Sequence, residues 1–272
     1  MTFPGNSYET AEFSEKAWAL RMVILGYTGV TALTGLLVWF VIPDGQKTTT
    51  GFERGTGLKL VMTHIVTVLR YRAVWLQAII VFCAYVAYKG FDNYSLFAVQ
   101  AYGLDPVDAA AIVTMGAWMR PIAALGAGLL GDRFTVSWML LLCFVLLLFS
   151  DLFFAFSTPV AGAAWVLLGN TLIACIAIFG FRGLYFALFE EARVPAAVTG
   201  TAVGLVSVIG FTPDIFVALV AGLLIDSNPG VVGHQHFFMF LSVFALVGAL
   251  ASLAMVFHVR RSEASPVTPS RA

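Results

Sequence analysis

Charged residues are scarce in this chain of 272 residues. Only 11% of its residues are Asp, Glu, Lys or Arg, and 60% are hydrophobic, whereas a soluble domain carries about 25% charged residues. So little charge cannot cover a water-exposed surface, which excludes a soluble globular protein. The bases and acids balance at 15 each, so no excess of positive charge points to nucleic acid. We therefore expect a membrane protein without a nucleic-acid partner.

Motifs for catalysis and metal binding are also missing. The chain has no HExxH or GxSxG motif, and its four histidines have no carboxylates at ligand spacing. The cysteines form no CxxC pair and lie in apolar runs, where they act as small hydrophobic residues: Cys83, Cys143 and Cys175. We predict no enzymatic activity, no metal and no cofactor. Coupling to a proton or another ion stays open.

Particular residues argue against two other classes of seven-helix membrane protein, retinal proteins and receptors. A retinal protein needs a lysine in its last span, and all four lysines lie elsewhere: Lys16, Lys47, Lys59 and Lys89. A receptor or interaction protein would explain an Asp-Arg pair, Asp132 and Arg133, at the end of a third span. Against it, the last span has no NPxxY element, and the chain's only Asn-Pro pair falls in a predicted outer loop. A receptor or interaction protein remains the alternative function.

Long apolar runs are what the sequence has in abundance. A hydrocarbon core of about 30 Å requires roughly 20 apolar residues in a helix. Seven runs meet this condition: 22–42, 73–89, 107–131, 136–157, 160–188, 197–225 and 236–258. The acidic opening segment lacks the basic start of a secretory signal, so we expect no cleaved presequence. The fold class is an all-α polytopic membrane protein with seven transmembrane helices.

The positions of Lys and Arg in the short loops predict the orientation. If the first span runs from outside to inside, ten of the bases lie in inner segments, including Lys47, Arg54 and Arg133. The C-terminus is then cytoplasmic. The predicted parts are an external tail (1–17), a first span (18–42), a cytoplasmic connector (43–72), a six-helix body (73–258) and a cytoplasmic tail (259–272).

The second half of the connector has helical periodicity. Leu58, Val61, Met62, Ile65 and Leu69 repeat at helical spacing beside basic residues. This pattern is typical of an amphipathic helix on the anionic cytoplasmic leaflet. The alternative is an early, water-exposed extension of the second span.

The third and sixth spans resemble each other. Each has a proline beside a charge, Pro121 after Arg120 and Pro213 before Asp214, followed by AGLLxD. The two spans are predicted to run in opposite directions, as in two inverted three-helix repeats, and paired prolines in such repeats mark a transport site. Small residues predict close helix packing at Gly128, Gly200 and Gly204.

Charges inside the spans are the candidate site residues. Arg120 and Asp214 fall near the middle of their spans, where each charge costs about 2.5 to 3.5 kcal/mol and must face protein or water. Arg120 is predicted to bind an anionic solute, with Asp214 as its counter-ion or a protonatable group; a fixed salt bridge between them is the alternative. Lys89 joins the site or anchors the interface. Uncharged candidates for the cavity lining are Gln77, Tyr85, Tyr88 and Asn170. Asp151 is expected to reach the outer interface.

The stretch GLLGDRF carries a family resemblance. With Gly128, Asp132 and Arg133 in a G-x-x-x-D-R frame, it is similar to the loop between the eighth and ninth helices of the major facilitator superfamily. Phe134 and Thr135 replace the basic tail of that motif. The stretches VLRYRAVW, TGTAVGLVSVIGF and VRRSE extend the resemblance over residues 18–262, to family helices six through twelve, closest to sugar-phosphate and organic-anion permeases.

The resemblance implies a function and a partner. The chain is expected to belong to a secondary active transporter of a small anionic solute, working by alternating access in the bacterial inner membrane. It would be a C-terminal-half fragment or a split subunit, whose partner is the missing N-terminal half. A cytoplasmic charge network that stabilises one conformation is expected to join five residues: Asp132, Arg133, Arg182, Glu190 and Glu191.

Overall fold

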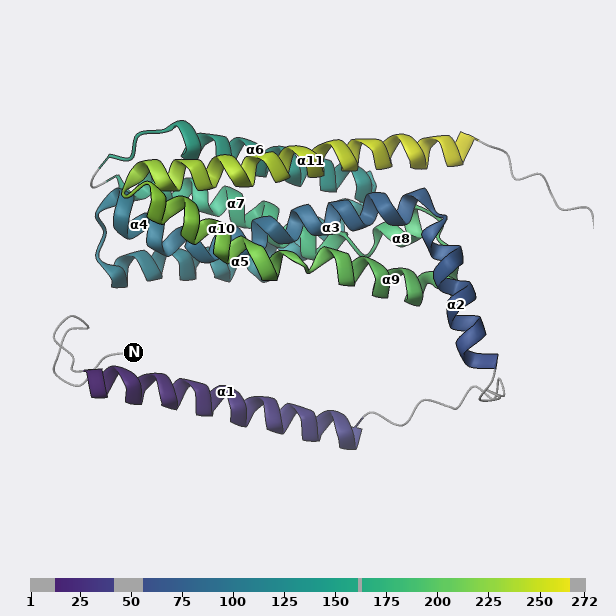
Figure 1. Ribbon diagram of the computed structural model, residues 1–272, viewed down its shortest axis with the longest axis horizontal. Helices are drawn as coiled ribbons and strands as arrows, with labels where there is room; N and C mark the ends of the chain where they lie inside the picture. The colour runs from purple at the N-terminus through teal and green to yellow at the C-terminus, as the bar shows by residue number, and fades with distance from the viewer. Residues whose placement is uncertain (1–12, 42–55, 161–162, 265–272) are drawn as a thin grey trace, which may run out of the picture. The chain divides into compact units, whose positions relative to one another are not determined.

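The structure, a computed structural model, describes residues 13–41, 56–160 and 163–264, and every regular element within them is a helix. The elements are shown in Figure 1: α1 (Phe13–Val41), α2 (Thr56–Leu69), α3 (Arg72–Gly90), the short 3-10 helix η1 (Phe91–Asn93), α4 (Tyr94–Tyr102), α5 (Pro106–Phe134), α6 (Val136–Phe156), α7 (Ala164–Leu184), α8 (Leu188–Glu191), α9 (Ala196–Gly210), α10 (Pro213–Ser227) and α11 (Val231–Ala264).

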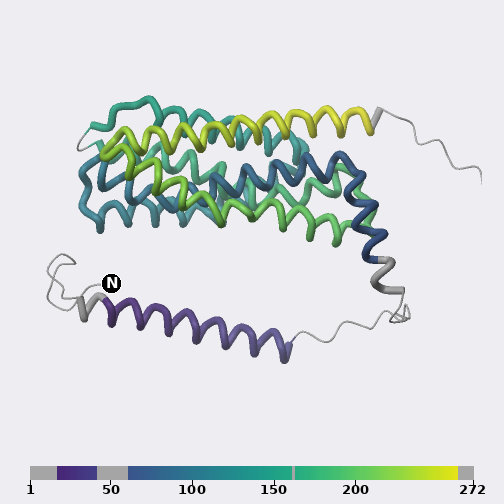
Figure 2. The backbone as a smooth tube through the Cα atoms, in the orientation of Figure 1, coloured from purple at the N-terminus to yellow at the C-terminus, as the bar shows by residue number. Residues whose placement is uncertain are grey.

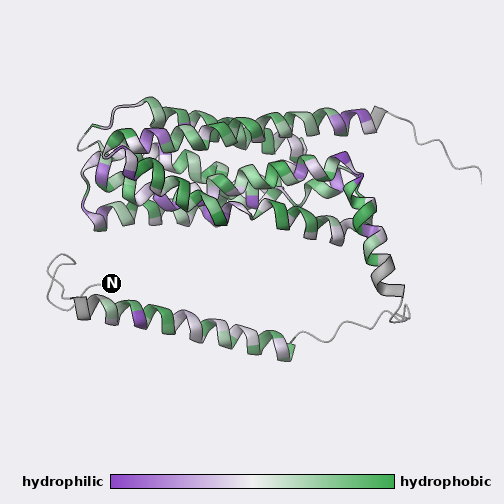
Figure 3. Ribbon diagram, in the orientation of Figure 1, coloured by the Kyte–Doolittle hydropathy of each residue, from purple (hydrophilic) through white to green (hydrophobic). Residues whose placement is uncertain are grey.

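Within these residues, seven helical stretches are long and apolar enough to cross a membrane. Their bounds are Ala17–Val41, Arg72–Tyr102, Pro106–Phe134, Val136–Phe156, Ala164–Leu184, Ala196–Ser227 and Val231–Ser262. Hydrophobic residues dominate along the bundle helices, as the green ribbon of Figure 3 shows. The chain is an all-α polytopic membrane protein, as the sequence predicted.

The first helix, α1, belongs to a separate unit that ends at Gly57. Its threonine hydroxyls donate to carbonyl oxygens one turn earlier: Thr28 to Ile24 at 2.8 Å and Thr31 to Tyr27 at 2.8 Å. These bonds satisfy polar groups on a helix that otherwise exposes large apolar side chains, as hydrocarbon surroundings require.

The second unit, from Leu58 onward, is a bundle whose closest helix pairs are α6 with α11, α5 with α7, and α3 with α11 (Figure 2). Aromatic rings fill one end of it. The ring centroids of Phe97 and Phe238 lie 4.9 Å apart, and those of Phe154 and Phe238 also lie 4.9 Å apart. All three side chains are buried, so this cluster joins α4, α6 and α11 in the core.

Glycines allow two of these helix pairs to approach closely. A Cβ atom on Gly183 of α7 would lie 2.6 Å from the backbone oxygen of Ala124 on α5. A Cβ atom on Gly248 of α11 would clash with the buried ring of Phe144 on α6. The sequence predicted close helix packing at Gly128, Gly200 and Gly204. Nothing in the described structure lies within 4 Å of a Cβ atom added at any of these three glycines. Within the described bundle, therefore, no helix packs closely against these three glycines.

The second span is longer than the apolar run predicted. The run ended at residue 89, but the helical path continues from α3 through η1 and α4 to Tyr102. Lys89 and Asp92 interrupt the hydropathy, yet their side chains pair at 2.7 Å, so the helix carries both charges together. Gly103, at φ 67°, ends the span in the left-handed conformation that glycine adopts without strain. Lys89 therefore lies inside the span.

The two proline positions differ in structure. Pro121 lies within α5, which continues through it to Phe134. The predicted sixth span is instead divided: α9 ends at Gly210, and α10 begins at Pro213 (Figure 1). Proline is well suited to the first turn of a helix because its missing N–H has no partner there. The break places Asp214 in the first turn of a new helix near the middle of the sixth span.

The connector prediction falls partly outside the described residues, since Lys47 and Arg54 are not among them. The described part contains α2, which ends at Leu69 before a turn at Arg70 and Tyr71. The indole N–H of Trp75 donates to the carbonyl of Leu69 at 2.9 Å. Because of this turn, α2 is a helix distinct from α3 rather than an extension of the second span.

Candidate functional site

A polar cluster joins α3, η1 and α10 at membrane depth. The ammonium of Lys89 lies 2.7 Å from a carboxylate oxygen of Asp92 and 3.5 Å from one of Asp214. The hydroxyl of Tyr85 donates to the other oxygen of Asp214 at 2.8 Å. The Asp214 side chain is still 51% exposed, and the ring of Tyr85 packs edge-on against Phe211. Lys89, one cation, thus faces two carboxylates.

Local structure favours the carboxylate of Asp214 at its position. Because α10 begins at Pro213, Asp214 lies where the helix dipole presents its positive end. A negative side chain in the first turn of a helix is stabilised by about 0.3 to 1 kcal/mol when exposed. Together with Lys89 and Tyr85, this terminus explains how a carboxylate is held within a membrane span.

Arg120 lies apart from this cluster, in the middle of α5. Its guanidinium is 4.8 Å from the centroid of the Phe179 ring of α7. Among the described residues no carboxylate lies within 4 Å of it. The predicted alternative, a fixed salt bridge between Arg120 and Asp214, is therefore not formed; Asp214 pairs with Lys89 instead.

A hollow of about 260 Å³ lies beside Arg120. Its lining includes Trp118, Pro121 and Ala117. Pro121 has no N–H, so the carbonyl of Ala117, four residues earlier, lacks its helical donor. The hollow, an open depression on α5, therefore combines a cation with no carboxylate within 4 Å among the described residues, an acceptor released from the helix ladder and an aromatic side chain.

We refer to these exposed mid-span groups, Arg120 and the separate Lys89 cluster, as the polar face. Arg120 and Asp214 are exposed, and Lys89 and Tyr85 are partly exposed. A charge facing hydrocarbon at the bilayer centre costs about 2.5 to 3.5 kcal/mol even on insertion scales. The exposed charges at the end of α3, in the middle of α5 and at the start of α10 are therefore suited to contact protein or water rather than lipid.

Two other predicted lining residues have structural roles instead. Gln77 is fully buried, and its amide donates to the carbonyl of Tyr185 at 2.6 Å, which ties α3 to the segment after α7. The amide of Asn170 donates to the carbonyl of Ser150 at 3.1 Å, which ties α7 to α6. Neither amide nitrogen is directed at the polar face.

The predicted charge network is not assembled by direct contacts. The guanidinium of Arg182 lies 4.6 Å from the ring centroid of Tyr88. Asp132 and Arg133 are exposed, and Arg133 lies 6.0 Å from the ring of its neighbour Phe134. Within the described chain no ion pair joins any of the five residues. Glu191 instead binds the start of α6, accepting from the N–H of Ser137 at 2.9 Å and from its hydroxyl.

Glu191 is expected to stabilise the bundle by capping α6. Glu191→Ala removes both acceptors and should lower the free energy of unfolding by about 1 to 2 kcal/mol, the usual cost of a lost helix cap. Glu190→Ala is the matched control, because Glu190 is exposed and makes no side-chain bond within the described residues. Thermal unfolding of the two variants in detergent measures the difference; equal melting temperatures would contradict the capping role.

Sequence reasoning missed two residues of this region and misplaced a third residue elsewhere in the bundle. Asp92 pairs with Lys89, and the i, i+3 spacing was the available signal. The ring of Phe179 on α7 packs against the guanidinium of Arg120 on α5. No signal in the sequence predicted this contact between two helices. Asp151 was expected to reach the interface, but its side chain is 1% exposed, and both carboxylate oxygens lack a hydrogen-bond partner among the described residues. That expectation was wrong, because α6 packs this position toward its neighbours.

Comparison with known proteins identifies two relatives. The chain is 27% identical over 263 residues to the inner membrane protein YqcE of Escherichia coli K12, a match covering 93% of this chain and 60% of the relative. It is 25% identical over 236 residues to the inner membrane protein YihN of the same strain, covering 85% of this chain and 55% of the relative. No family model matches the chain. The chain thus spans about three-fifths of the length of the relatives it matches, both of which are inner membrane proteins.

Proposed function

We propose that this chain forms part of a secondary transporter that moves a small organic anion across the bacterial inner membrane. The observation that supports it most directly is Arg120, an exposed cation in the middle of a span with no carboxylate within 4 Å among the described residues. A guanidinium in such a position favours a carboxylate or phosphate, which it can bind through two parallel hydrogen bonds. The hollow beside Arg120 gives such a group a place to lie.

The roles of the other polar residues follow from their pairing. Lys89 already faces Asp92 and Asp214, so it serves as their counter-ion, and Arg120 carries the anion. Asp214 is half exposed and hydrogen-bonded to Tyr85. If a proton is coupled to transport, protonation of Asp214 would release Lys89 from one of its two carboxylates. The cluster then rearranges while α10, which begins at Pro213, moves relative to α3.

Alternating access requires a second helical body against the polar face. We infer that this body is an N-terminal half of the kind the family resemblance implies; the remaining two-fifths of YqcE, which lie outside the match, leave room for it. Gly128, Gly200 and Gly204 have open space around them in this bundle and would then pack against that body. Asp132 and Arg133, both exposed, would form their charge contacts with it. Inner-membrane relatives support the location.

A matched pair of sugars tests the proposal. Glucuronate and glucose share a ring and differ by a carboxylate, so a site built on Arg120 should respond to the first alone. We expect millimolar glucuronate or glucose 6-phosphate, but not glucose, to raise the melting temperature of the purified protein, since a ligand stabilises the state that it binds. Proteoliposomes that contain the chain together with the N-terminal half should then accumulate the labelled anion that stabilises the protein.

Two outcomes would contradict the proposal. Equal effects of glucose and both anions would show that charge is not recognised. Stabilisation by an anion without any uptake or counterflow, once the chain is reconstituted together with the N-terminal half, would favour the alternative of a membrane receptor or interaction protein.

A further inference from the structure

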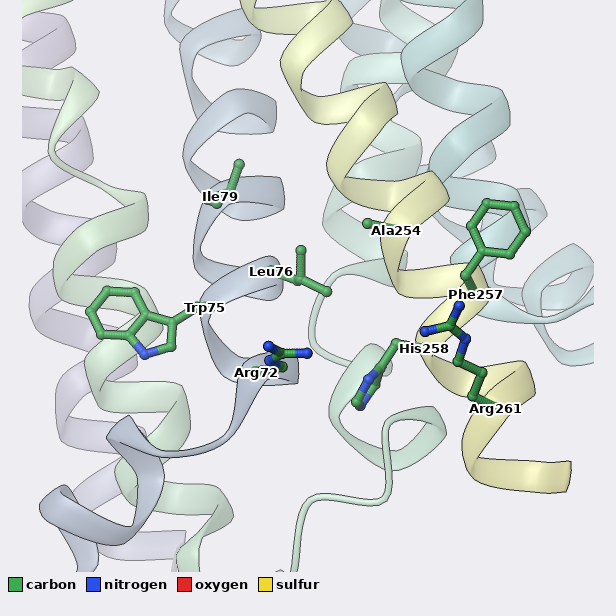
Figure 4. Close-up of a pocket in the computed structure, with 8 residues that line it drawn as sticks. All are labelled: Arg72, Trp75, Leu76, Ile79, Ala254, Phe257, His258 and Arg261. Carbon is green, nitrogen blue, oxygen red and sulfur yellow. The ribbon is translucent and has the colours of Figure 1, made fainter. Parts of the chain in front are cut away.

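A second site lies between the start of α3 and the end of α11 (Figure 4). The aromatic cluster of Phe97, Phe154 and Phe238 lies at the other end of the bundle. The second site is a groove of about 560 Å³. Its polar part is formed by Arg72, His258 and Arg261, and Figure 4 shows the guanidinium groups of both arginines directed into the space between the helices. None of these residues belongs to the polar face around Arg120.

The groove changes character along the helices. Arg72 is the first residue of α3, and Leu76 and Ile79 follow it on the groove wall; Phe257 precedes His258 on α11. The cations therefore lie at the helix ends and the apolar groups toward the middle of the spans. Ile79 is 41% exposed and Phe257 is 54% exposed, so the apolar wall is open to the surrounding hydrocarbon.

Nearby residues are typical of a membrane interface. Trp75, also on the groove wall, binds the carbonyl of Leu69 through its indole N–H and keeps its ring 45% exposed. Tryptophan with this combination is enriched at the headgroup level of bilayers. The positive-inside rule assigns this end of the helices to the cytoplasmic leaflet, which carries the anionic lipids.

We propose that this groove binds one anionic phospholipid, with its phosphate diester between Arg72 and Arg261 and an acyl chain along Leu76, Ile79 and Phe257. The charge pattern favours this occupant: two guanidinium groups and an imidazole match one phosphate, and the open apolar wall matches a chain that continues into the bilayer. Inorganic phosphate would meet the same cations but leave the apolar wall uncovered. The proposal goes beyond transport and does not depend on the anion site at Arg120.

The bound lipid would connect two elements that are far apart in sequence. α3 is the first long helix of the bundle in sequence and α11 is the last. The groove lies between the start of α3 and the end of α11. A phosphate bound by both Arg72 and Arg261 would join the start of α3 to the end of α11. The lipid therefore stabilises the end of the bundle from which α2 leads away.

The test is lipid binding by the purified full chain, measured by native mass spectrometry in detergent. We expect one dioleoyl phosphatidylglycerol to be retained in preference to dioleoyl phosphatidylcholine. Arg72→Gln with Arg261→Gln should weaken this binding by about tenfold or more, because each basic residue at an anionic interface contributes separately. Arg70→Gln with Arg260→Gln is the matched control, since it removes two neighbouring charges that do not line the groove.

The outcomes distinguish a lipid held in the groove from a lipid attracted by charge alone and from a free phosphate. Equal loss in the two double variants would reveal general electrostatic attraction and overturn the proposal, as would equal retention of the two lipids by the parent protein. Displacement of phosphatidylglycerol by excess inorganic phosphate would identify a phosphate site instead. If the Arg72 and Arg261 variant does not fold, Ala254→Trp fills the groove from its α11 wall and keeps both arginines; undiminished retention in that variant would also overturn the proposal.

Discussion

Gly183→Leu is expected to prevent the bundle from assembling. A Cβ atom at this position would lie 2.6 Å from the backbone oxygen of Ala124, and backbone cannot move aside as a flexible side chain can. α5 and α7 form one of the closest helix pairs in the protein, so separating them would also disturb the packing of Arg120 on Phe179. Overpacking costs about 1 to 3 kcal/mol or more per site. Because the leucine side chain would press against backbone, we expect its destabilisation to lie at or above the upper end of that range.

The measurement is the yield of monodisperse protein after detergent extraction, followed by thermal unfolding of whatever is recovered. Gly169→Leu is the matched control: it lies on the same helix, and nothing is within 4 Å of its added Cβ atom. We expect aggregation or loss of Gly183→Leu and near-parental behaviour of Gly169→Leu. Parental stability of Gly183→Leu would mean that α5 and α7 do not approach as described.

Arg120→Gln is expected to abolish anion uptake while leaving the fold intact. Glutamine keeps hydrogen-bonding capacity but removes the charge, and a hydrogen bond to a charged group contributes about 1.5 to 3 kcal/mol, which corresponds to a loss of about ten- to a hundredfold in affinity. The side chain is exposed and contacts a single ring, Phe179, so its replacement costs little stability. Arg120→Lys should retain only part of the activity. The positive charge is kept, but the planar guanidinium that binds a carboxylate through two parallel hydrogen bonds is lost.

Initial uptake rates, measured over a range of anion concentrations in proteoliposomes that contain the chain together with the N-terminal half, test this expectation. Arg193→Gln is the control, since Arg193 lies outside the apolar spans. If Arg120→Gln transported the anion as fast as the parent and with an unchanged half-saturating concentration, Arg120 would have no part in binding. If Arg193→Gln were equally impaired, the loss would reflect general charge rather than the site.

Much of the secondary structure was accessible from the sequence, because apolar runs of about twenty residues have one stable solution in hydrocarbon. The third and fourth spans agree with the predicted runs to within a few residues. The second did not, since the apolar criterion counted Lys89 and Asp92 as an interruption, whereas their mutual pairing lets the helix continue. Hydropathy adds residues one by one and cannot register a pair of charges that neutralise each other.

The candidate site was predicted less completely than the spans. Asp214, Lys89 and Tyr85 do form one cluster, but Arg120 lies apart from it, and Gln77 and Asn170 tie helices together. No signal in the sequence distinguished an amide that lines a cavity from one that bonds a neighbouring backbone. The same holds for the glycines: every glycine permits close approach, and only the partner helix determines which ones are used, as Gly183 and Gly248 are within this bundle.

The sequence by itself determined that this protein is helical, lies in the membrane and carries a few costly charges within its spans, because these properties follow from composition and spacing along one chain. The tertiary structure decided which charge meets which. Asp214 pairs with Lys89 and Tyr85 rather than with Arg120, since α10 restarts at Pro213 and packs beside α3. Arg120 lies against an aromatic ring, and no carboxylate among the described residues pairs with it; this positive charge, a property of helix packing rather than of sequence, is the basis of the proposed function.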